Sequence, residues 1–218
     1  MTQNMKPAAA IFDLDGLMLD TERPFITALA AKNAESGWDV PFDTLIKIIG
    51  INCRASEKLL KDMLGSEYPF MDLRSEILRH EKTRYEAEGI PHKPGLIPLL
   101  DSLREKKIPA AVATSTDRDR ALWKLRCGGI LERFDAIVCG DEIQHGKPAP
   151  DIFLRAAEKL ALPAACCAGL EDSPAGLTAL AAAGIRSIFI KDMIEPDAEV
   201  RAAVWKCCSS LYEVIPLF

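Results

Sequence analysis

The stretch Ala8-Ala9-Ala10-Ile11-Phe12-Asp13-Leu14-Asp15-Gly16 decides which fold the sequence encodes. Its first five residues form a continuous apolar run, which is typical of a strand buried within a parallel sheet. Two acids, Asp13 and Asp15, follow at the carboxyl end of that strand. Open α/β sheets bind their ligands just outside this end of their strands. Two acids there can hold a cation, and one can act as a nucleophile while the other transfers protons.

Four further apolar runs predict additional strands, because they are continuous rather than alternating. They span residues 109–114, 136–139, 165–170 and 187–190. Apolar side chains between these runs recur at helical spacing, for example at Leu96, Leu99 and Leu103. The alternation predicts the α/β class, with a Rossmann-like parallel sheet and helices on both of its faces.

The interval between the first two predicted strands departs from this alternation. From Leu17 to Lys93 the sequence contains amphipathic helical patterns and no convincing strand, which is too long for a simple crossover. The Pro- and Gly-rich segment 89–95 has the composition of a linker. The sequence therefore predicts an all-α cap at residues 17–92, inserted into a catalytic core made of residues 1–16 and 93–218.

Composition indicates a globular protein: of 218 residues, 49% are hydrophobic and 27% are charged. The net charge of −5 argues against a nucleic-acid partner, and Arg118, Arg120, Lys124 and Arg126 are interpreted as a solvated helix face. No apolar stretch approaches the roughly 18 residues that span a bilayer, and the polar N-terminus lacks a signal-peptide layout. We therefore expect a cytoplasmic protein that has no membrane partner. Seven cysteines, an odd number without a C-x-x-C motif, argue against a disulfide framework or a zinc site.

Polar residues follow the other predicted strands as well. Thr114-Ser115-Thr116 follows the second strand, where hydroxyls and backbone N–H groups near a helix N-terminus can hold a phosphate. Thr116 and Asp119 have the spacing of a capping box. Lys147, before a rigid Pro-Ala-Pro segment, follows the third strand, and Glu171-Asp172 follows the fourth.

Four carboxylates, one lysine and several hydroxyls are thus expected to meet at one edge of the sheet. Carboxylates that are packed together repel one another, and a divalent cation would relieve that repulsion. Mg²⁺ suits such a site, because it takes few carboxylates and keeps water and phosphate oxygens as its other ligands. Lys147 together with the cation would neutralise a phosphoryl group.

Four separated segments resemble, in order, the motifs of the haloacid dehalogenase superfamily of hydrolases. They are Asp13-Leu14-Asp15-Gly16, Thr114-Ser115, Lys147 with its Pro-Ala-Pro tail, and Gly169-Leu170-Glu171-Asp172-Ser173. The resemblance covers nearly the whole chain, including the position of the inserted helices. Within the superfamily the sequence is most similar to the β-phosphoglucomutase-like phosphatases that carry a helical cap.

The resemblance implies a phosphatase that hydrolyses a small phosphorylated metabolite, of the sugar phosphate or nucleoside monophosphate type, through an aspartyl-phosphate. Asp13 would be the nucleophile and Asp15 the general acid/base. Lys147 would steady the charge on Asp13 and on the phosphoryl oxygens. Thr114 and Ser115 would bind the transferring phosphoryl group.

The resemblance also implies the metal site and the role of the cap. Asp13, the backbone carbonyl of Asp15, and Asp172 would ligate Mg²⁺, with Glu171 in or next to that shell. The cap would close over the site and select the substrate. The chain is expected to act as a monomer or a homodimer.

Two residues outside these motifs are candidates for substrate contact. Glu22 follows the first motif, and Arg54 lies beside the segment Gly50-Ile51-Asn52-Cys53. Each also has an ordinary interpretation, because acids are common in the first turn of a helix and arginines are common at solvated helix starts.

Other activities remain open at the level of sequence. A phosphomutase is the alternative, although β-phosphoglucomutases resemble one another in a Thr-Asp-Thr and a cap Gly-Val-Ser-Arg, where this chain has Leu19-Asp20-Thr21 and Gly50-Ile51-Asn52-Cys53-Arg54. A dehalogenase needs no acid at the position of Asp15, since a halide leaves without a proton. A binding protein with a vestigial site would have lost a nucleophile or a metal acid, and neither is missing here. A calcium loop starting at Asp13 fails, because its twelfth position is Pro24.

Overall fold

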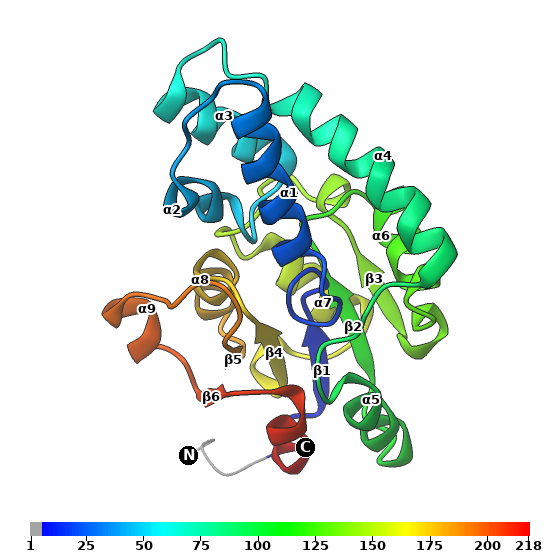
Figure 1. Cartoon of the computed structure of the whole chain (residues 1–218). Helices are drawn as coiled ribbons and strands as arrows, with labels where there is room; N and C mark the ends of the chain where they lie inside the picture. The colour runs from blue at the N-terminus through cyan, green and yellow to red at the C-terminus, as the bar shows by residue number, and fades with distance from the viewer. Residues whose placement is uncertain (1–5) are drawn as a thin grey trace.

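A six-stranded parallel sheet forms the centre of the computed structural model, which describes residues 6–218 (Figure 1). The strands are β1 (Ala9–Phe12), β2 (Ala110–Ala113), β3 (Ala136–Val138), β4 (Cys167–Glu171), β5 (Arg186–Ile190) and β6 (Lys206–Cys208). Their order is β3-β2-β1-β4-β5-β6, and all neighbouring pairs are parallel. The predicted α/β class is confirmed. The sixth strand was not predicted, because β6 is short and largely exposed.

Helices cover both faces of the sheet, as the alternating pattern predicted. Their bounds are α5 (Leu96–Glu105), α6 (Arg118–Cys127), α7 (Asp151–Lys159), α8 (Pro174–Ala182) and α9 (Ala198–Ala202), with 3₁₀ turns η2 (Leu131–Arg133), η3 (Gly140–Glu142), η4 (Ala164–Cys166) and η5 (Leu211–Leu217). Successive side chains of β1 alternate between the two faces. Ala10 and Phe12 belong to the hydrophobic cluster with α5, α6 and η5, whereas Ala9 and Ile11 belong to the cluster with α7 and α8.

The position of β1 in the sheet explains where a site can form. Ile11 of β1 pairs with Ala111 of β2 on one side and with Gly169 of β4 on the other. The chain crosses from one half of the sheet to the other between β3 and β4, so the switch point of the topology lies beside β1. Ligands of open α/β sheets bind at such a point, outside the carboxyl ends of the strands.

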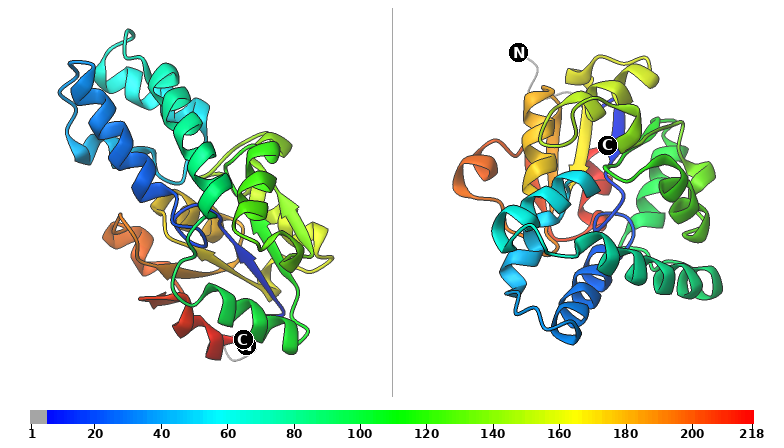
Figure 2. Two further views of the ribbon diagram at one scale, coloured as in Figure 1. Left: turned by 45° about the vertical axis from the view of Figure 1, so that its right-hand side comes forward. Right: turned by 90° about the horizontal axis from the view of Figure 1, so that it is seen from above.

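Four helices follow β1, before α5 and β2, and extend away from the sheet together with the 3₁₀ turn η1 (Ile46–Ile48) (Figure 2). They are α1 (Glu22–Glu35), α2 (Phe42–Leu45), α3 (Cys53–Leu64) and α4 (Phe70–Glu88). They enclose a hydrophobic cluster of their own, whose largest buried side chains include Tyr68 and Phe70. We refer to these four helices, with η1 and the loops that join them, as the cap and to the remaining elements as the core.

Two backbone segments connect the cap to the core, and they run side by side. Leu19 and His92 form an antiparallel bridge. Asp192, in the loop after β5, pairs with Lys93 at 2.8 Å and with Arg23 at 3.1 Å. Leu19 is buried in the core cluster rather than in the cap cluster. We therefore propose that the cap begins just after Leu19, slightly later than the sequence pattern suggested.

Two general expectations from the sequence can be compared with the structure. None of the helices within residues 6–218 is both long and apolar enough to cross a membrane. All seven cysteines are free thiols. Cys139 and Cys167 are buried, while Cys166 and Cys207 are exposed.

Candidate active site

Asp13 lies at the carboxyl end of β1, where the sheet brings three strand ends together. Its side chain is buried, and its Oδ1 is 2.5 Å from the Nζ of Lys147. The same ammonium donates to Glu171 Oε1 at 2.5 Å and to the carbonyl of Ala113 at 3.2 Å. These partners come from the ends of β1, β4 and β2, so the strand order itself assembles this group.

Burial and the neighbouring opposite charge have opposite effects on the pKa of Asp13 and on the pKa of Lys147. Burial raises the pKa of Asp13 to about 7, the Lys147 ammonium opposes the rise, and the Glu171 carboxylate adds to it. Burial lowers the pKa of Lys147, but Asp13 and Glu171 outweigh it, so the pKa of Lys147 is raised. Lys147 is therefore a fixed positive charge beside a carboxylate that is held away from water.

Asp15 lies in the turn after Asp13 and is held by three donors. Thr21 donates to its Oδ1 at 2.5 Å, Thr116 donates to its Oδ2 at 2.8 Å, and Lys124 forms an ion pair with its Oδ1. Burial favours the neutral form, but Lys124 and the two hydroxyls lower the pKa of Asp15 to about 2. In this arrangement Asp15 is an anion, and both of its oxygens are occupied.

Lys124 is a site residue that the sequence pattern did not identify. It was assigned to a solvated helix face, yet it is 5% exposed and contacts Asp15. The spacing of Ala121, Lys124 and Leu125 puts all three on one buried face of α6, which was the available signal. The proposed capping box is also wrong: Asp117 occupies the N-cap position without a side-chain cap, and Thr116 donates to Asp15 instead.

The Asp172 carboxylate approaches the turn between Asp13 and Gly16 without a hydrogen bond to any described residue. The approach depends on Gly16, which has a φ of 82° and whose Cβ, if present, would lie 2.3 Å from Asp172 Oδ2. Burial raises the pKa of Asp172 well above its usual value, and Glu171 and Asp13 raise it further. A buried carboxylate without a partner beside a second carboxylate fits a cation.

The donor set fits Mg²⁺ better than a metal that needs a full cage of side chains. Within residues 6–218, no three His, Cys, Asp or Glu side chains are gathered in a metal-holding group. Mg²⁺ is commonly bound by one or two carboxylates, with water and phosphate oxygens completing its shell. Asp13, Asp172 and the backbone carbonyl of Asp15 would meet that need.

Glu171 was expected in or next to the metal shell, and the protein itself occupies its carboxylate oxygens. Its Oε1 accepts from Lys147, and its Oε2 accepts from the N–H groups of Asp172 and Ser173 and from the Ser173 hydroxyl. Ser173 in turn caps α8, as its sequence before Pro174 indicated. Because its oxygens are already satisfied, we assign Glu171 to holding Lys147 and leave it out of the metal site.

The two hydroxyl residues after β2 lie at the same pocket but have different partners. Thr114 is buried, and its Oγ1 accepts from the N–H of Thr116 at 3.1 Å, which leaves its own O–H free to donate. Ser115 donates to the carbonyl of Gly50 in the cap at 3.0 Å. The Ser115 hydroxyl therefore connects core and cap in this conformation.

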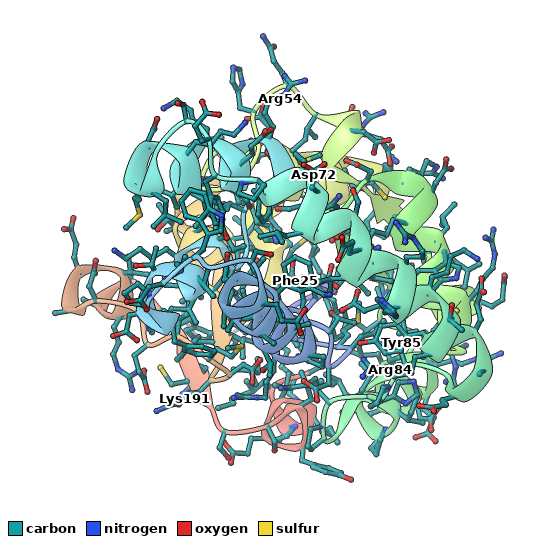
Figure 3. The ribbon with its side chains drawn as sticks, turned by 45° about the horizontal axis from the view of Figure 1, so that its top comes forward. Phe25, Arg54, Asp72, Arg84, Tyr85 and Lys191 are labelled. Carbon is teal, nitrogen blue, oxygen red and sulfur yellow. The ribbon has the colours of Figure 1, made fainter. Side chains whose placement is uncertain are left out.

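A pocket between the core and the cap opens onto these groups. We call its core side the floor and its cap side the roof. Its lining includes Asp13, Asp15, Thr114, Ser115 and Lys124 on the floor and Phe25, Ile48, Ile51, Ser56, Phe70, Arg74 and Leu78 on the roof. Glu22 also lines it, where burial and then the charge of Asp15 raise the pKa of Glu22 to about 8. Arg54 does not line it: its side chain is exposed and projects outward from the end of α3 (Figure 3).

Comparison with known proteins agrees with this architecture. The sequence profile of the haloacid dehalogenase-like hydrolases matches residues 7–184. The chain is 32% identical over 181 residues to a phosphorylated carbohydrates phosphatase of Thermotoga maritima, covering 83% of each chain. It is 33% identical over 204 residues to a β-phosphoglucomutase of Bacillus subtilis, covering 88% of each.

A solved structure shares the whole fold. The crystal structure of CbbY from Rhodobacter sphaeroides in complex with phosphate superposes with a TM-score of 0.76 at 25% identity, covering 95% of this chain and 96% of that one. The profile match, the relatives and the shared fold agree with the order of the four motif segments. This chain belongs to the haloacid dehalogenase-like hydrolase family.

Proposed function

We propose that the protein is a Mg²⁺-dependent phosphatase that hydrolyses a small phosphorylated metabolite through an aspartyl-phosphate on Asp13. The observation that carries the proposal is that Asp13, Asp15 and Thr114 line one pocket, with the fixed cation Lys147 directly behind Asp13. The relatives support the substrate class, since they include a phosphatase of phosphorylated carbohydrates.

The first half of the reaction forms the covalent intermediate. A carboxylate oxygen of Asp13 attacks phosphorus, and the bond from phosphorus to the ester oxygen breaks. Lys147 and the donors at Thr114 offset the charge on the phosphoryl oxygens. The leaving oxygen takes its proton from Asp15, which must first leave its three donors and acquire that proton.

The second half removes the phosphoryl group from Asp13. Asp15, now an anion, accepts a proton from water as the water oxygen attacks phosphorus, and orthophosphate leaves with the free Asp13 carboxylate restored. The donors Lys124, Thr21 and Thr116 favour the ionised form that this step requires. Mg²⁺ held by Asp13, Asp172 and the carbonyl of Asp15 would supply positive charge that lets an anionic nucleophile approach a phosphate.

The direct test is release of orthophosphate from para-nitrophenyl phosphate and from a panel of sugar phosphates, with Mg²⁺ and with EDTA. We expect turnover with Mg²⁺ and loss of turnover with EDTA. Rapid acid quenching followed by peptide mass spectrometry should find one phosphoryl group on the peptide that contains Asp13. Absence of turnover on every substrate, or labelling of another residue, would contradict the proposal.

A phosphomutase is the second candidate, because a β-phosphoglucomutase is among the relatives. The position of Arg54 favours the phosphatase: the cap segment that carries an arginine in β-phosphoglucomutases brings Cys53 to the pocket here, and Arg54 faces solvent. Conversion of glucose 1-phosphate with a bisphosphate primer would separate the two activities.

A further inference from the structure

Three cationic side chains line the pocket: Arg74, Arg120 and Lys124. They differ in whether an acidic side chain of the protein pairs with them. Lys124 pairs with Asp15, and Arg120 pairs with Glu81 at 3.0 Å. Arg74, on the cap helix α4, makes no hydrogen bond, ion pair or ring contact with any residue of the described chain.

A guanidinium without a partner is unusual in such a place. Arg74 is partly buried, and its neighbours in the roof include the apolar side chains of Ile51, Phe70 and Leu78. No hydrogen-bond acceptor of the described chain occupies its five N–H donors, so they are available to an acceptor on a ligand. Asp117 also lines the pocket, but it is exposed and forms no ion pair with Arg74.

The floor and the roof of the pocket therefore suit different parts of a substrate. In the proposed reaction the phosphoryl group lies against Asp13 and Thr114 on the floor, so the remainder of the substrate would extend toward the roof. An uncharged sugar in that position would leave the Arg74 guanidinium unpaired. A planar anion would accept two parallel N–H bonds from it, which is the geometry that guanidinium groups bind best.

We propose that Arg74 binds a second anionic group of the substrate, a carboxylate or a second phosphoryl group, at the roof of the pocket. The inference rests on the proposed phosphatase activity and names its substrate class: metabolites that carry an anion in addition to the phosphoryl group that is removed. Arg74 is then the residue that determines specificity.

Two matched substrate pairs test the proposal and separate the two kinds of anion. Glycerol 3-phosphate is compared with 3-phosphoglycerate for a carboxylate, and fructose 1-phosphate with fructose 1,6-bisphosphate for a phosphoryl group. We expect the wild-type protein to prefer the member with the second anion by about tenfold or more in kcat/KM for at least one pair, as for a charge-assisted bidentate contact. Arg74→Met should reduce that preference to within about threefold, and Arg74→Lys should keep part of it.

Arg54→Met is the matched control, since it removes the same charge from an exposed position of the neighbouring cap helix. It should keep the wild-type preference. No preference in either pair, or an undiminished preference in a folded Arg74→Met protein, would overturn the proposal.

Binding measurements keep this outcome separate from the fate of the proposed function. Calorimetric titration of the Asp13→Asn protein with the same four compounds in Mg²⁺ compares dissociation constants without turnover. Failure of the wild-type protein to hydrolyse para-nitrophenyl phosphate would reject the phosphatase activity alone. Equal dissociation constants within both pairs would reject the role of Arg74, whatever the activity.

Discussion

The floor and the roof of the pocket use charge in opposite ways. On the floor, Lys147 is bound by Asp13 and Glu171, and Asp15 is bound by Lys124, so the reacting groups are held by the protein itself. On the roof, Arg74 lines the pocket together with apolar side chains and makes no hydrogen bond or ion pair within the described chain. In the proposed function, the floor is preorganised for one reaction, whereas the roof leaves Arg74 available to the substrate. Changes on the floor should therefore affect every substrate, and changes on the roof should affect some substrates only.

The largest effect on all substrates is expected when the proposed nucleophile on the floor is neutralised. Asp13→Asn removes the attacking carboxylate, and we expect kcat to fall by roughly three orders of magnitude or more on every phosphate ester, as for other covalent catalysts. The measurement is orthophosphate release from para-nitrophenyl phosphate. Asp72→Asn, an exposed position on α4, is the control and should behave as the wild type. Full activity of the Asp13→Asn protein would contradict the proposed aspartyl-phosphate mechanism.

The next largest effect should come from Lys124, which links the floor to helix α6. Lys124→Met leaves the Asp15 carboxylate with two hydroxyl donors and no counter-ion, and we expect kcat/KM to fall roughly 10- to 100-fold for all substrates alike, which is less than the roughly 100- to 10,000-fold contribution of a general acid or base because Asp15 itself remains. Lys124→Arg should restore part of the loss. Arg126→Met, which removes an exposed charge from the same helix, should change little. A loss confined to one substrate would place Lys124 with the roof instead.

The stabilisation of the protein by Mg²⁺ should depend on pH if the cation binds the carboxylates of the floor. An acid with a raised folded-state pKa binds more protons when folded, so stability falls as pH rises from the unfolded value of about 4 toward the folded one. Asp13 reaches about 7, and the pKa of Asp172 is raised as well. We expect Mg²⁺ to raise the melting temperature by several degrees more at pH 8 than at pH 5, at roughly 2–4 °C per kcal/mol. Equal shifts at both pH values in a thermal unfolding assay would argue against a cation at these carboxylates.

The smallest expected effect concerns the contact between cap and core. Glu81 of α4 pairs with Arg120 of α6, and their side chains are 7% and 22% exposed. A double-mutant cycle with Glu81→Gln and Arg120→Met should give a coupling of about 1 kcal/mol in unfolding free energy, as for a partly exposed ion pair. In kinetic assays we expect KM to rise a few-fold with little change in kcat. A large loss of kcat would show that this pair belongs to the reacting groups.

The sequence predicted most of the core because its signals are local. Five of the six strands have continuous apolar runs, and the carboxyl ends of parallel strands share one edge, so motif order alone was enough to place Asp13, Lys147 and Asp172 together. The strand β6 was not predicted, because the largely exposed edge strand Lys-Cys-Cys has no continuous apolar run.

The remaining site residues depend on contacts between distant segments. Lys124 was hidden because a basic residue in a basic helix is usually solvated, although its spacing with Ala121 and Leu125 marks a buried face. Arg74 and Arg54 both lie on amphipathic cap helices, and only the packing of the cap on the core shows that Arg74 lines the pocket and Arg54 does not. Neither periodicity nor motif spacing contains that information.

The place of β1 between β2 and β4 has a consequence for how the enzyme is made. On the ribosome β1 emerges first, but one of its two neighbours, β4, appears only after most of the chain has been synthesised. Until then one edge of β1 is open, and Asp172 has not reached Gly16. The nascent chain therefore contains the proposed nucleophile, Asp13, long before β4 brings Glu171 and Asp172 to its side. Gain of catalytic activity during translation would thus report the pairing of β4 with β1.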